Sequence, residues 1–214
     1  MTEIRILLAD EHAVMRKALR LAIERRPGLN IVAEAVTTGE AVELAAAMSP
    51  QVAIVDIALP RLNGVEISRC IVDRSPATAV VILSGHSDES YVLGALRAGA
   101  RAYLLKECAA TDLVRAIESV VRGGHFFSPA IRRHLSQDAT VPGGENGYRQ
   151  LTPGEREVFL GLAEGSSDLE IANSLQLSLV TVGERKGAIL RKLGLASIPD
   201  LVFYALRSGI CGSL

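Results

Sequence analysis

Hydrophobic positions in the first half of the chain alternate between short apolar runs and stretches with helical spacing. Five runs rich in β-branched and apolar residues are typical of buried strands, and they cover residues 4–9, 30–35, 52–55, 79–83 and 102–104. Apolar residues recur with helical spacing after each run, over residues 14–25, 39–48, 65–74, 89–98 and 111–122. Five successive strand–helix units predict an α/β fold with a five-stranded, doubly wound parallel sheet, because parallel neighbours need right-handed crossovers that place helices on both faces.

The pattern changes after these units. A further helix is predicted over residues 126–135, whereas residues 136–147 have no hydrophobic periodicity, as is typical of a linker. The rest of the chain shows only helical spacing, over residues 153–164, 168–175, 179–193 and 199–207. We therefore expect an α/β domain over residues 1–125, a helix and flexible linker over 126–147, and a small all-α domain over 148–214.

Composition narrows the class of protein. The 214 residues carry a net charge of −1, with 49% hydrophobic and 22% charged residues, which is typical of a packed soluble protein. No apolar run is long enough to span a bilayer, and the N-terminus enters a strand pattern directly, unlike a signal peptide. We therefore expect a cytoplasmic protein with no membrane role. Cys70, Cys108 and Cys211 are odd in number and far apart, which favours three reduced thiols over disulfides or a zinc site.

Acidic side chains stand at the ends of two predicted strands. Asp10 and Glu11 end the first strand, and Asp56 ends the third. Ligands in doubly wound folds bind beyond the carboxyl ends of the strands, so we expect these three acids to converge there. One such acid alone is more often a solvated loop residue. Three together repel one another unless a cation lies among them, and hard oxygen ligands that leave room for water suit Mg²⁺.

Two further polar side chains follow the next strands. Ser84 ends the fourth predicted strand, and Lys106, one of only four lysines in the chain, follows the fifth. With Asp56 as nucleophile and Mg²⁺ bridging to the phosphoryl oxygens, a hydroxyl and a fixed ammonium can neutralise the remaining charge. The set therefore predicts an aspartyl phosphate on Asp56. Taken alone, Lys106 is equally explained as an exposed lysine that favours solubility.

Four segments carry a more specific pattern. They are Leu-Leu-Ala-Asp-Glu-His at 7–12, Val-Asp-Ile-Ala-Leu-Pro-Arg-Leu-Asn-Gly at 55–64, Ile-Leu-Ser-Gly at 82–85 and Gly-Ala-Arg-Ala-Tyr-Leu-Leu-Lys at 99–106. Together they resemble the receiver domain of bacterial two-component response regulators. The resemblance implies a flavodoxin-like fold and transfer of a phosphoryl group from a sensor histidine kinase to Asp56. It also implies a Mg²⁺ ion held by Glu11, Asp56 and the carbonyl of Ala58, with Asp10 acting through water.

The resemblance further implies a two-state switch. Ser84 would move towards the phosphoryl group while Tyr103 turns inward, although a half-buried strand aromatic is an equally good explanation of Tyr103 alone. Two residues depart from the family's pattern. Glu11 stands where Asp is commoner, which lengthens the reach to the metal. Gly85 replaces the small residue, often Ala, after the switch hydroxyl, and we hypothesise that it opens access to the phosphoryl group and shortens its lifetime.

The C-terminal helices predict a second motif. Residues 168–175 and 179–193 form a helix, a short turn and a helix that Ser178 can cap. This arrangement sets a recognition helix into the major groove of DNA, although any small helical bundle contains such a turn.

Sequence motifs favour the DNA-binding explanation. Leu-Thr-Pro-Gly-Glu-Arg-Glu-Val and Ile-Leu-Arg-Lys-Leu-Gly-Leu are similar to the LuxR-type helix-turn-helix, over about residues 148–210. Joined to a receiver, this domain resembles the NarL/FixJ group of transcription regulators. In that group the last helix, here residues 199–207, pairs two copies on a palindromic site.

The recognition helix departs from the family's pattern. Its core-facing stripe consists of Val182, Ile189 and Leu193. The side where DNA would lie carries Val180, Gly183, Glu184 and Gly187. The family typically has Lys where this chain has Gly183, and Glu184 adds a negative charge beside it. Residues 148–214 contain seven Arg or Lys and seven Asp or Glu, so this domain is neutral where a DNA-binding domain is usually basic.

The predicted DNA contacts come from this helix. They are Ser178, Val180, Thr181, Glu184, Arg185, Lys186, Arg191 and Lys192. The four cations can contact phosphates, and Glu184 can accept a hydrogen bond from cytosine N4. A solvated helix face is the alternative explanation of the cations.

Two hypotheses of function follow. The first is a phosphorylation-controlled transcription regulator, whose partners are a sensor histidine kinase, promoter DNA and a second copy bound through the receiver face or the last helix. The second is a protein-interaction module that is still switched by phosphorylation but binds DNA weakly or not at all. An enzyme is not expected, because Asp56 lacks a second acid two residues on and no Gly-x-Gly-x-x-Gly follows the first strand.

Overall fold

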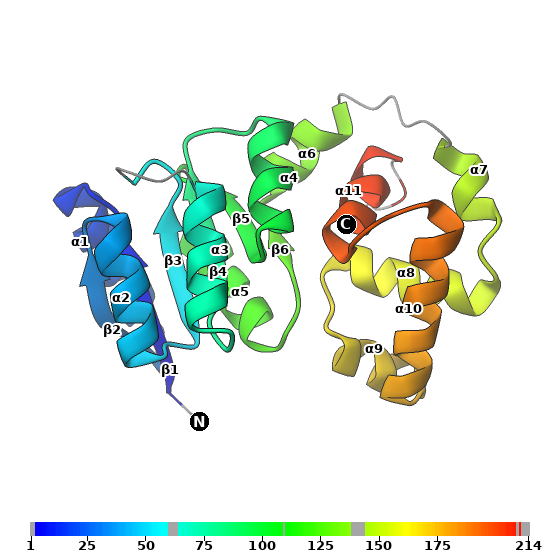
Figure 1. Ribbon diagram of the computed structural model, residues 1–214, viewed down its shortest axis with the longest axis horizontal. Helices are drawn as coiled ribbons and strands as arrows, with labels where there is room; N and C mark the ends of the chain where they lie inside the picture. Colours follow the sequence, from blue (N-terminus) through cyan, green and yellow to red (C-terminus); the bar gives the residue numbers. More distant parts are fainter. Residues whose placement is uncertain (1–2, 60–63, 109, 138–143, 209, 211–214) are drawn as a thin grey trace. The chain divides into compact units, whose positions relative to one another are not determined.

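The computed structural model describes residues 3–59, 64–108, 110–137, 144–208 and 210 (Figure 1). These residues form two compact units. The first contains the described residues up to Val121 together with Phe126–Ser128, and the second contains Arg122–His125 and the described residues from Pro129 onward.

The first unit is a six-stranded parallel sheet covered by helices. Its strands are β1 (Ile4–Ala9), β2 (Leu29–Ala35), β3 (Val52–Asp56), β4 (Ala79–Ser84), β5 (Ala100–Leu105) and β6 (Phe126–Phe127), in the order β2-β1-β3-β4-β5-β6. Its helices are α1 (Ala13–Glu24), α2 (Thr38–Met48), α3 (Gly64–Arg74), α4 (Glu89–Arg97) and α5 (Ala110–Val121). Helix α1 packs beside α5, and α3 packs between α2 and α4, so the two groups cover opposite faces (Figure 1).

The central strands lie in the core of this unit. Ile6, Leu8 and Ile54 point to one face and pack with Ile117 of α5. Every residue of β3 and β4 is buried, because helices cover the sheet on both sides. The predicted α/β fold with a doubly wound parallel sheet is confirmed, but the predicted number of five strands is wrong, since the sheet has six.

The helix predicted over residues 126–135 is wrong at its start. Phe126 and Phe127 form β6, which pairs with β5 through Ala102 and Tyr103. Both phenylalanines are buried, so the sheet edge stabilises an extended backbone that the local pattern does not reveal. Helix α6 (Pro129–Gln137) begins three residues later than predicted, at a proline, which is well suited to a first helical position.

The second unit is wholly helical in the part that the structure describes. Its further helices are α7 (Gly144–Arg149), α8 (Pro153–Glu164), α9 (Asp168–Leu175), α10 (Leu179–Leu193) and α11 (Ile198–Arg207). Phe159, Val182, Ile189 and Leu201 are central to its core. Helix α9, a short turn and α10 form the predicted helix-turn-helix. Among the described residues of both units, no helix has the length and apolarity needed to cross a membrane.

Side-chain caps determine where the last four helices begin. Thr152, Ser167, Ser178 and Ser197 each accept a hydrogen bond from the backbone N–H three residues on. At Thr152 and Ser167 the side chain of the glutamate three residues on accepts a hydrogen bond from the backbone N–H of the capping residue, which completes a capping box. The cap at Ser178, predicted from the sequence, is confirmed, and it fixes the first turn of α10.

The linker prediction over residues 136–147 is partly wrong. Helix α6 extends to Gln137, and α7 covers residues 144–149. Residues 138–143 lie outside the described residues. The pattern did not reveal α7, since a six-residue helix stabilised by tertiary packing leaves little periodicity in the sequence.

Candidate functional site

The ends of β1 and β3 bring two aspartates together. Ala9 of β1 is the register partner of Val55 of β3, so Asp10 and Asp56 follow directly opposite each other. Their side chains are each only 1% exposed. Lys106, just after β5, places its Nζ 3.0 Å from Asp10 Oδ2 and 2.6 Å from Asp56 Oδ2. The sequence prediction that these three residues converge at one sheet edge therefore agrees with the geometry.

Lys106 supplies a charge that the two carboxylates need. Burial lowers the pKa of Lys106, but its hydrogen bonds to Asp56 and Asp10 outweigh this effect and the pKa is raised overall. The ammonium therefore stays charged at neutral pH. The Lys106 backbone N–H also donates to the carbonyl of Ser84, at 2.8 Å, which fixes the loop that carries the cation.

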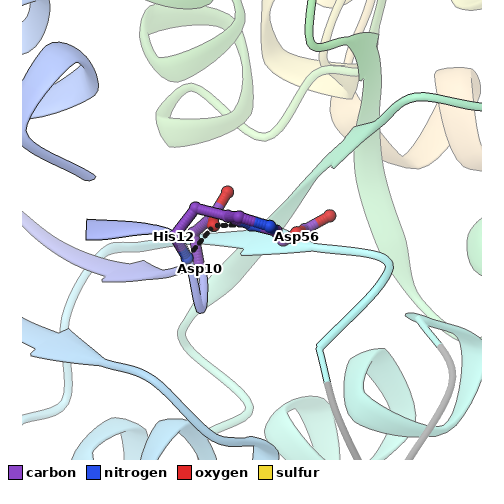
Figure 2. Close-up of side chains that lie close together, drawn as sticks. All are labelled: Asp10, His12 and Asp56. Carbon is purple, nitrogen blue, oxygen red and sulfur yellow. Dashed lines mark hydrogen bonds and ion pairs between the residues drawn. The ribbon is translucent and has the colours of Figure 1, made fainter. Parts of the chain in front are cut away.

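His12 belongs to this cluster and was not predicted. Its backbone N–H donates to Asp10 Oδ1 at 2.7 Å, and its Nδ1 lies 3.1 Å from the same oxygen. Ligand atoms of Asp10, His12 and Asp56 all lie within 4.8 Å of one another (Figure 2). The signal in the sequence was a histidine next to the acidic pair, three residues beyond the end of β1.

Glu11 and Ala58 are the other two residues of the predicted ligand set, and each contacts a member of the cluster. The Glu11 side chain is 43% exposed, and its Oε1 lies 4.0 Å from His12 Nε2. The backbone N–H of Ala58 donates to Asp56 Oδ1 at 3.1 Å, which orients the Asp56 carboxylate. The metal roles predicted for Glu11 and for the Ala58 carbonyl stay predictions.

Ser84 and Tyr103 are both completely buried. Both contact the backbone of His86, in the loop after β4: Ser84 Oγ accepts from the His86 N–H at 2.9 Å, and the Tyr103 hydroxyl donates to the His86 carbonyl at 2.9 Å. Burial raises the pKa of Tyr103. One loop residue therefore joins the two side chains that the family resemblance assigns to the switch.

The donor set suits a divalent cation. Two buried carboxylates and an imidazole can supply oxygen and nitrogen ligands, and exposed His12 and Glu11 leave the cluster open on one side. The Lys106 ammonium bonds Oδ2 of both aspartates, so it can neutralise negative charge on a group that becomes bound to Asp56.

The exposed side of the N-terminal half of α10 is largely apolar and acidic. Leu179 is 54% exposed and Val180 is 71% exposed, and Gly183 and Glu184 are exposed as well. Val182 and Ile189 are completely buried and Leu193 is partly buried, which confirms the predicted core-facing stripe. The N-terminal half of α10 therefore presents Val180 and Glu184 to solvent.

Three of the four predicted phosphate-contacting cations have partners inside the second unit. The Arg185 guanidinium donates to the Gly154 carbonyl at 3.1 Å. Lys186 Nζ lies 2.5 Å from Asp168 Oδ2, and Lys192 Nζ lies 2.7 Å from Glu155 Oε2. Arg191 is exposed. No local pattern indicates these partners, since each lies 18 to 37 residues away along the chain.

Family comparisons match both units. Residues 6–118 match the response regulator receiver domain, and residues 149–205 match the bacterial regulatory proteins of the luxR family. The chain belongs to the LuxR-type two-component response regulators. It is 31% identical to the transcriptional regulatory protein DegU of Brevibacillus brevis, over 97% of this chain and 94% of that protein.

Solved structures of such regulators are similar. A LuxR-family response regulator from Aurantimonas is 35% identical with a TM-score of 0.61, and the match covers 64% of this chain and 98% of that one. The response regulator RcsB, solved as a DNA complex, is 23% identical with a TM-score of 0.60, over 95% of this chain and 98% of that one. At that identity the RcsB match shows the fold alone.

Proposed function

We propose that this response regulator accepts a phosphoryl group on Asp56 from a sensor histidine kinase and thereby controls transcription through its helix-turn-helix. The observation that carries the proposal is the bridge of Lys106 between Asp10 and Asp56 at the carboxyl edge of the sheet. Asp56 is held for reaction, because Ala58 and Lys106 each bond one of its oxygens.

The transfer is a displacement at phosphorus. A carboxylate oxygen of Asp56 attacks the phosphorus of the kinase phosphohistidine, the P–N bond breaks, and its electron pair returns to the imidazole. Lys106 neutralises charge on the phosphoryl oxygens as it leaves Asp56 Oδ2. Asp10, Asp56, Glu11 and the carbonyl of Ala58 are the groups proposed to hold a Mg²⁺ ion, which would supply positive charge for the remaining phosphoryl oxygens. In this reaction the chain itself becomes phosphorylated, and we do not propose that it turns over a substrate as an enzyme does.

Phosphorylation reaches the rest of the receiver through Ser84. In the proposed switch, the Ser84 hydroxyl turns to the phosphoryl group and gives up its bond from the His86 N–H. Because the Tyr103 hydroxyl donates to the His86 carbonyl, this loop transmits the change to β5 and α4.

The test is phosphorylation with a small phosphodonor in the presence of Mg²⁺. We expect a mass gain of one phosphoryl group in the unmodified chain and none in Asp56→Asn, while Asp112→Asn, at an acid away from the cluster, behaves like the unmodified chain. Labelling that persists in Asp56→Asn would show that Asp56 is not the acceptor.

DNA contact is proposed for the exposed side of α10. Val180 can contact a thymine methyl group, and Glu184 can accept a hydrogen bond from cytosine N4. Ser178, Thr181 and Arg191 lie on the same helix, and Arg185, Lys186 and Lys192 can reach phosphates after leaving their present partners.

A second candidate is a module that docks a protein in place of DNA. The pairing of Lys186 and Lys192 with acids favours it, because paired cations attract phosphates weakly. Retention of genomic fragments by the phosphorylated protein at low salt separates the two. Retention supports transcription control through DNA, and no retention of any fragment supports protein docking.

Dimerisation is proposed for the receiver face or for α11. Residues 201–206 of α11 are all buried, and α6 packs against this helix within the second unit. Pairing two copies through α11 therefore requires α6 to move away. The sedimentation velocity of the phosphorylated chain tests the pairing, and a monomer at all concentrations would contradict it.

A further inference from the structure

We propose that His12 is a nitrogen ligand of the divalent cation and shifts the preference of the site from Mg²⁺ towards Mn²⁺. This inference rests on the proposed phosphorylation site, since it concerns the same cation. It adds a residue that determines which metal the site selects.

His12 contacts Oδ1 of Asp10, the carboxylate oxygen that Lys106 does not bond. Asp10 Oδ1 accepts the His12 backbone N–H at 2.7 Å, and this bond fixes the turn that carries the imidazole. His12 Nδ1 lies 3.1 Å from the same oxygen (Figure 2). Two atoms at this separation can be adjacent ligands of one ion, because ligands about 2.2 Å from a metal and at right angles lie about 3.1 Å apart.

Asp56 lies within reach of the same ion. The ligand atoms of Asp10, His12 and Asp56 are all within 4.8 Å of one another. Opposite ligands of one ion lie about 4.4 Å apart, so a shift of a few tenths of an ångström closes the set. The His12 side chain is 61% exposed, and rotation of its ring needs no repacking of the core.

Lys106 does not compete with this ion for Asp10. Its Nζ bonds Oδ2 of Asp10 and Oδ2 of Asp56, whereas His12 contacts Oδ1 of Asp10. The carboxylate of Asp10 can therefore hold the ammonium and the metal at the same time, each through a different oxygen.

Ligand chemistry sets the direction of the preference. Mg²⁺ prefers oxygen ligands and keeps its water, whereas transition metals such as Mn²⁺ accept imidazole more readily. Nδ1 coordinates when the ring carries its proton on Nε2, so the ion replaces the hydrogen bond that Nδ1 now makes to Asp10. A neutral imidazole contributes to Mn²⁺ binding and adds little to Mg²⁺ binding.

The experiment measures both metals on the full chain. Calorimetric titration with MnCl₂ and with MgCl₂ compares the unmodified chain with His12→Ala and with a matched control, His134→Ala, at a histidine of α6. We expect His12→Ala to weaken Mn²⁺ binding by about tenfold and Mg²⁺ binding by less than about twofold. The control should leave both affinities unchanged.

A spectroscopic arm separates ligation from mere positioning of Asp10. Pulsed electron paramagnetic resonance of the Mn²⁺ complex should show coupling to a directly bound nitrogen, and His12→Ala should remove it. Equal weakening of both metals in His12→Ala, or no nitrogen coupling in the unmodified chain, would overturn the proposal.

The same data test the phosphorylation site separately. Asp56→Asn should weaken binding of both metals if the cation lies at the proposed site. Binding of both metals without nitrogen coupling would remove His12 as a ligand and leave the phosphorylation site intact. Failure of the unmodified chain to bind either metal would overturn the cation site itself.

Discussion

At the scale of residues, Gly85 is proposed to influence the lifetime of the phosphoryl group on Asp56. It follows Ser84, it is exposed, and a Cβ built on it meets no atom within 4 Å. The space beside the proposed phosphoryl position is therefore open at this residue. A methyl group there would fit without strain and would restrict the approach of water.

We predict that Gly85→Ala slows the loss of the phosphoryl group from Asp56. The expected slowing is roughly threefold, which corresponds to less than about 1 kcal/mol of added barrier. The measurement is the decay of phosphorylated protein after the phosphodonor is removed. An unchanged decay would contradict the role of Gly85, and so would a half-life of many hours in the unmodified chain.

We expect Lys106 to contribute to stability as well as to the proposed phosphoryl transfer. Its ammonium lies between two carboxylates that are each only 1% exposed, and the bonds to both keep it charged. Removal of the cation leaves two buried negative charges next to each other, which is costly unless another cation replaces it.

We predict that Lys106→Met destabilises the first unit by about 1–3 kcal/mol in the presence of a chelator, a range that allows for the partial exposure of the lysine. Added Mg²⁺ should restore part of the loss, since it supplies the missing charge. Urea unfolding with chelator and with Mg²⁺ measures both effects. Equal unfolding midpoints for Lys106→Met and the unmodified chain would contradict this prediction.

At the scale of elements, α10 combines a well-capped start with weak positions on its exposed side. Gly183 is exposed, and a Cβ built on it meets no atom within 4 Å. Glycine inside a helix costs roughly 0.8–1.0 kcal/mol relative to alanine. The helix therefore gives up stability at a position where the family typically carries lysine.

A pair of substitutions at Gly183 separates helix stability from DNA binding. We predict that Gly183→Ala and Gly183→Lys each stabilise the second unit by about 0.5–1 kcal/mol. Only Gly183→Lys should raise affinity for DNA, because it adds a charge where phosphates would lie. Thermal unfolding and fragment retention measure the two effects, and equal DNA affinities of both variants would argue for protein docking by α10.

The start of α8 is joined to the end of α10 by the pair of Glu155 and Lys192. The hydrogen bond from Lys192 and then that from the Thr152 N–H lower the pKa of Glu155 from 4.5. A lowered pKa means that the charged form is favoured by folding. Its contribution is present above the ordinary carboxyl pKa and is lost as the pH falls through the lowered one.

We predict that the second unit loses stability as the pH falls below about 4.5, and that Glu155→Gln removes part of this dependence. Glutamine keeps the capping bond and loses the charge, so the loss at neutral pH should be about 1 kcal/mol. Unfolding of both proteins between pH 3 and pH 7 provides the test. Parallel pH profiles of the two would contradict the role of Glu155.

At the scale of the whole molecule, charge is balanced over the region that contains the helix-turn-helix. Residues 148–214 contain as many acidic as basic residues, and Lys186 and Lys192 lie against Asp168 and Glu155. DNA affinity that depends on few phosphate contacts falls only slowly with salt. The molecule is therefore suited to a DNA contact that depends on base edges more than on charge.

We predict a shallow salt dependence of DNA binding that Asp168→Asn makes steeper. Release of Lys186 from its partner adds about one phosphate contact, which should increase the slope of log affinity against log salt by about 1. Binding measured over a series of KCl concentrations gives the slope. An unchanged slope in Asp168→Asn would show that Lys186 does not reach DNA.

The sequence by itself determined the elements of the fold. Strands β1 to β5 and helices α1 to α5 lie within two residues of their predicted bounds, and α8, α9 and α10 match theirs. These elements depend on local information, namely apolar periodicity and side-chain caps such as Ser178. The sequence also brought Asp10, Asp56 and Lys106 to one edge, because the order of parallel strands fixes where their ends lie.

Only the tertiary structure decided what those side chains contact. β6 exists because Phe126 and Phe127 find a partner in β5, and His12 joins the cluster because a turn after β1 points its ring back at Asp10. Lys186 and Lys192 meet acids 18 and 37 residues away. Such pairings form through space between distant residues, so no local pattern in the sequence can encode them.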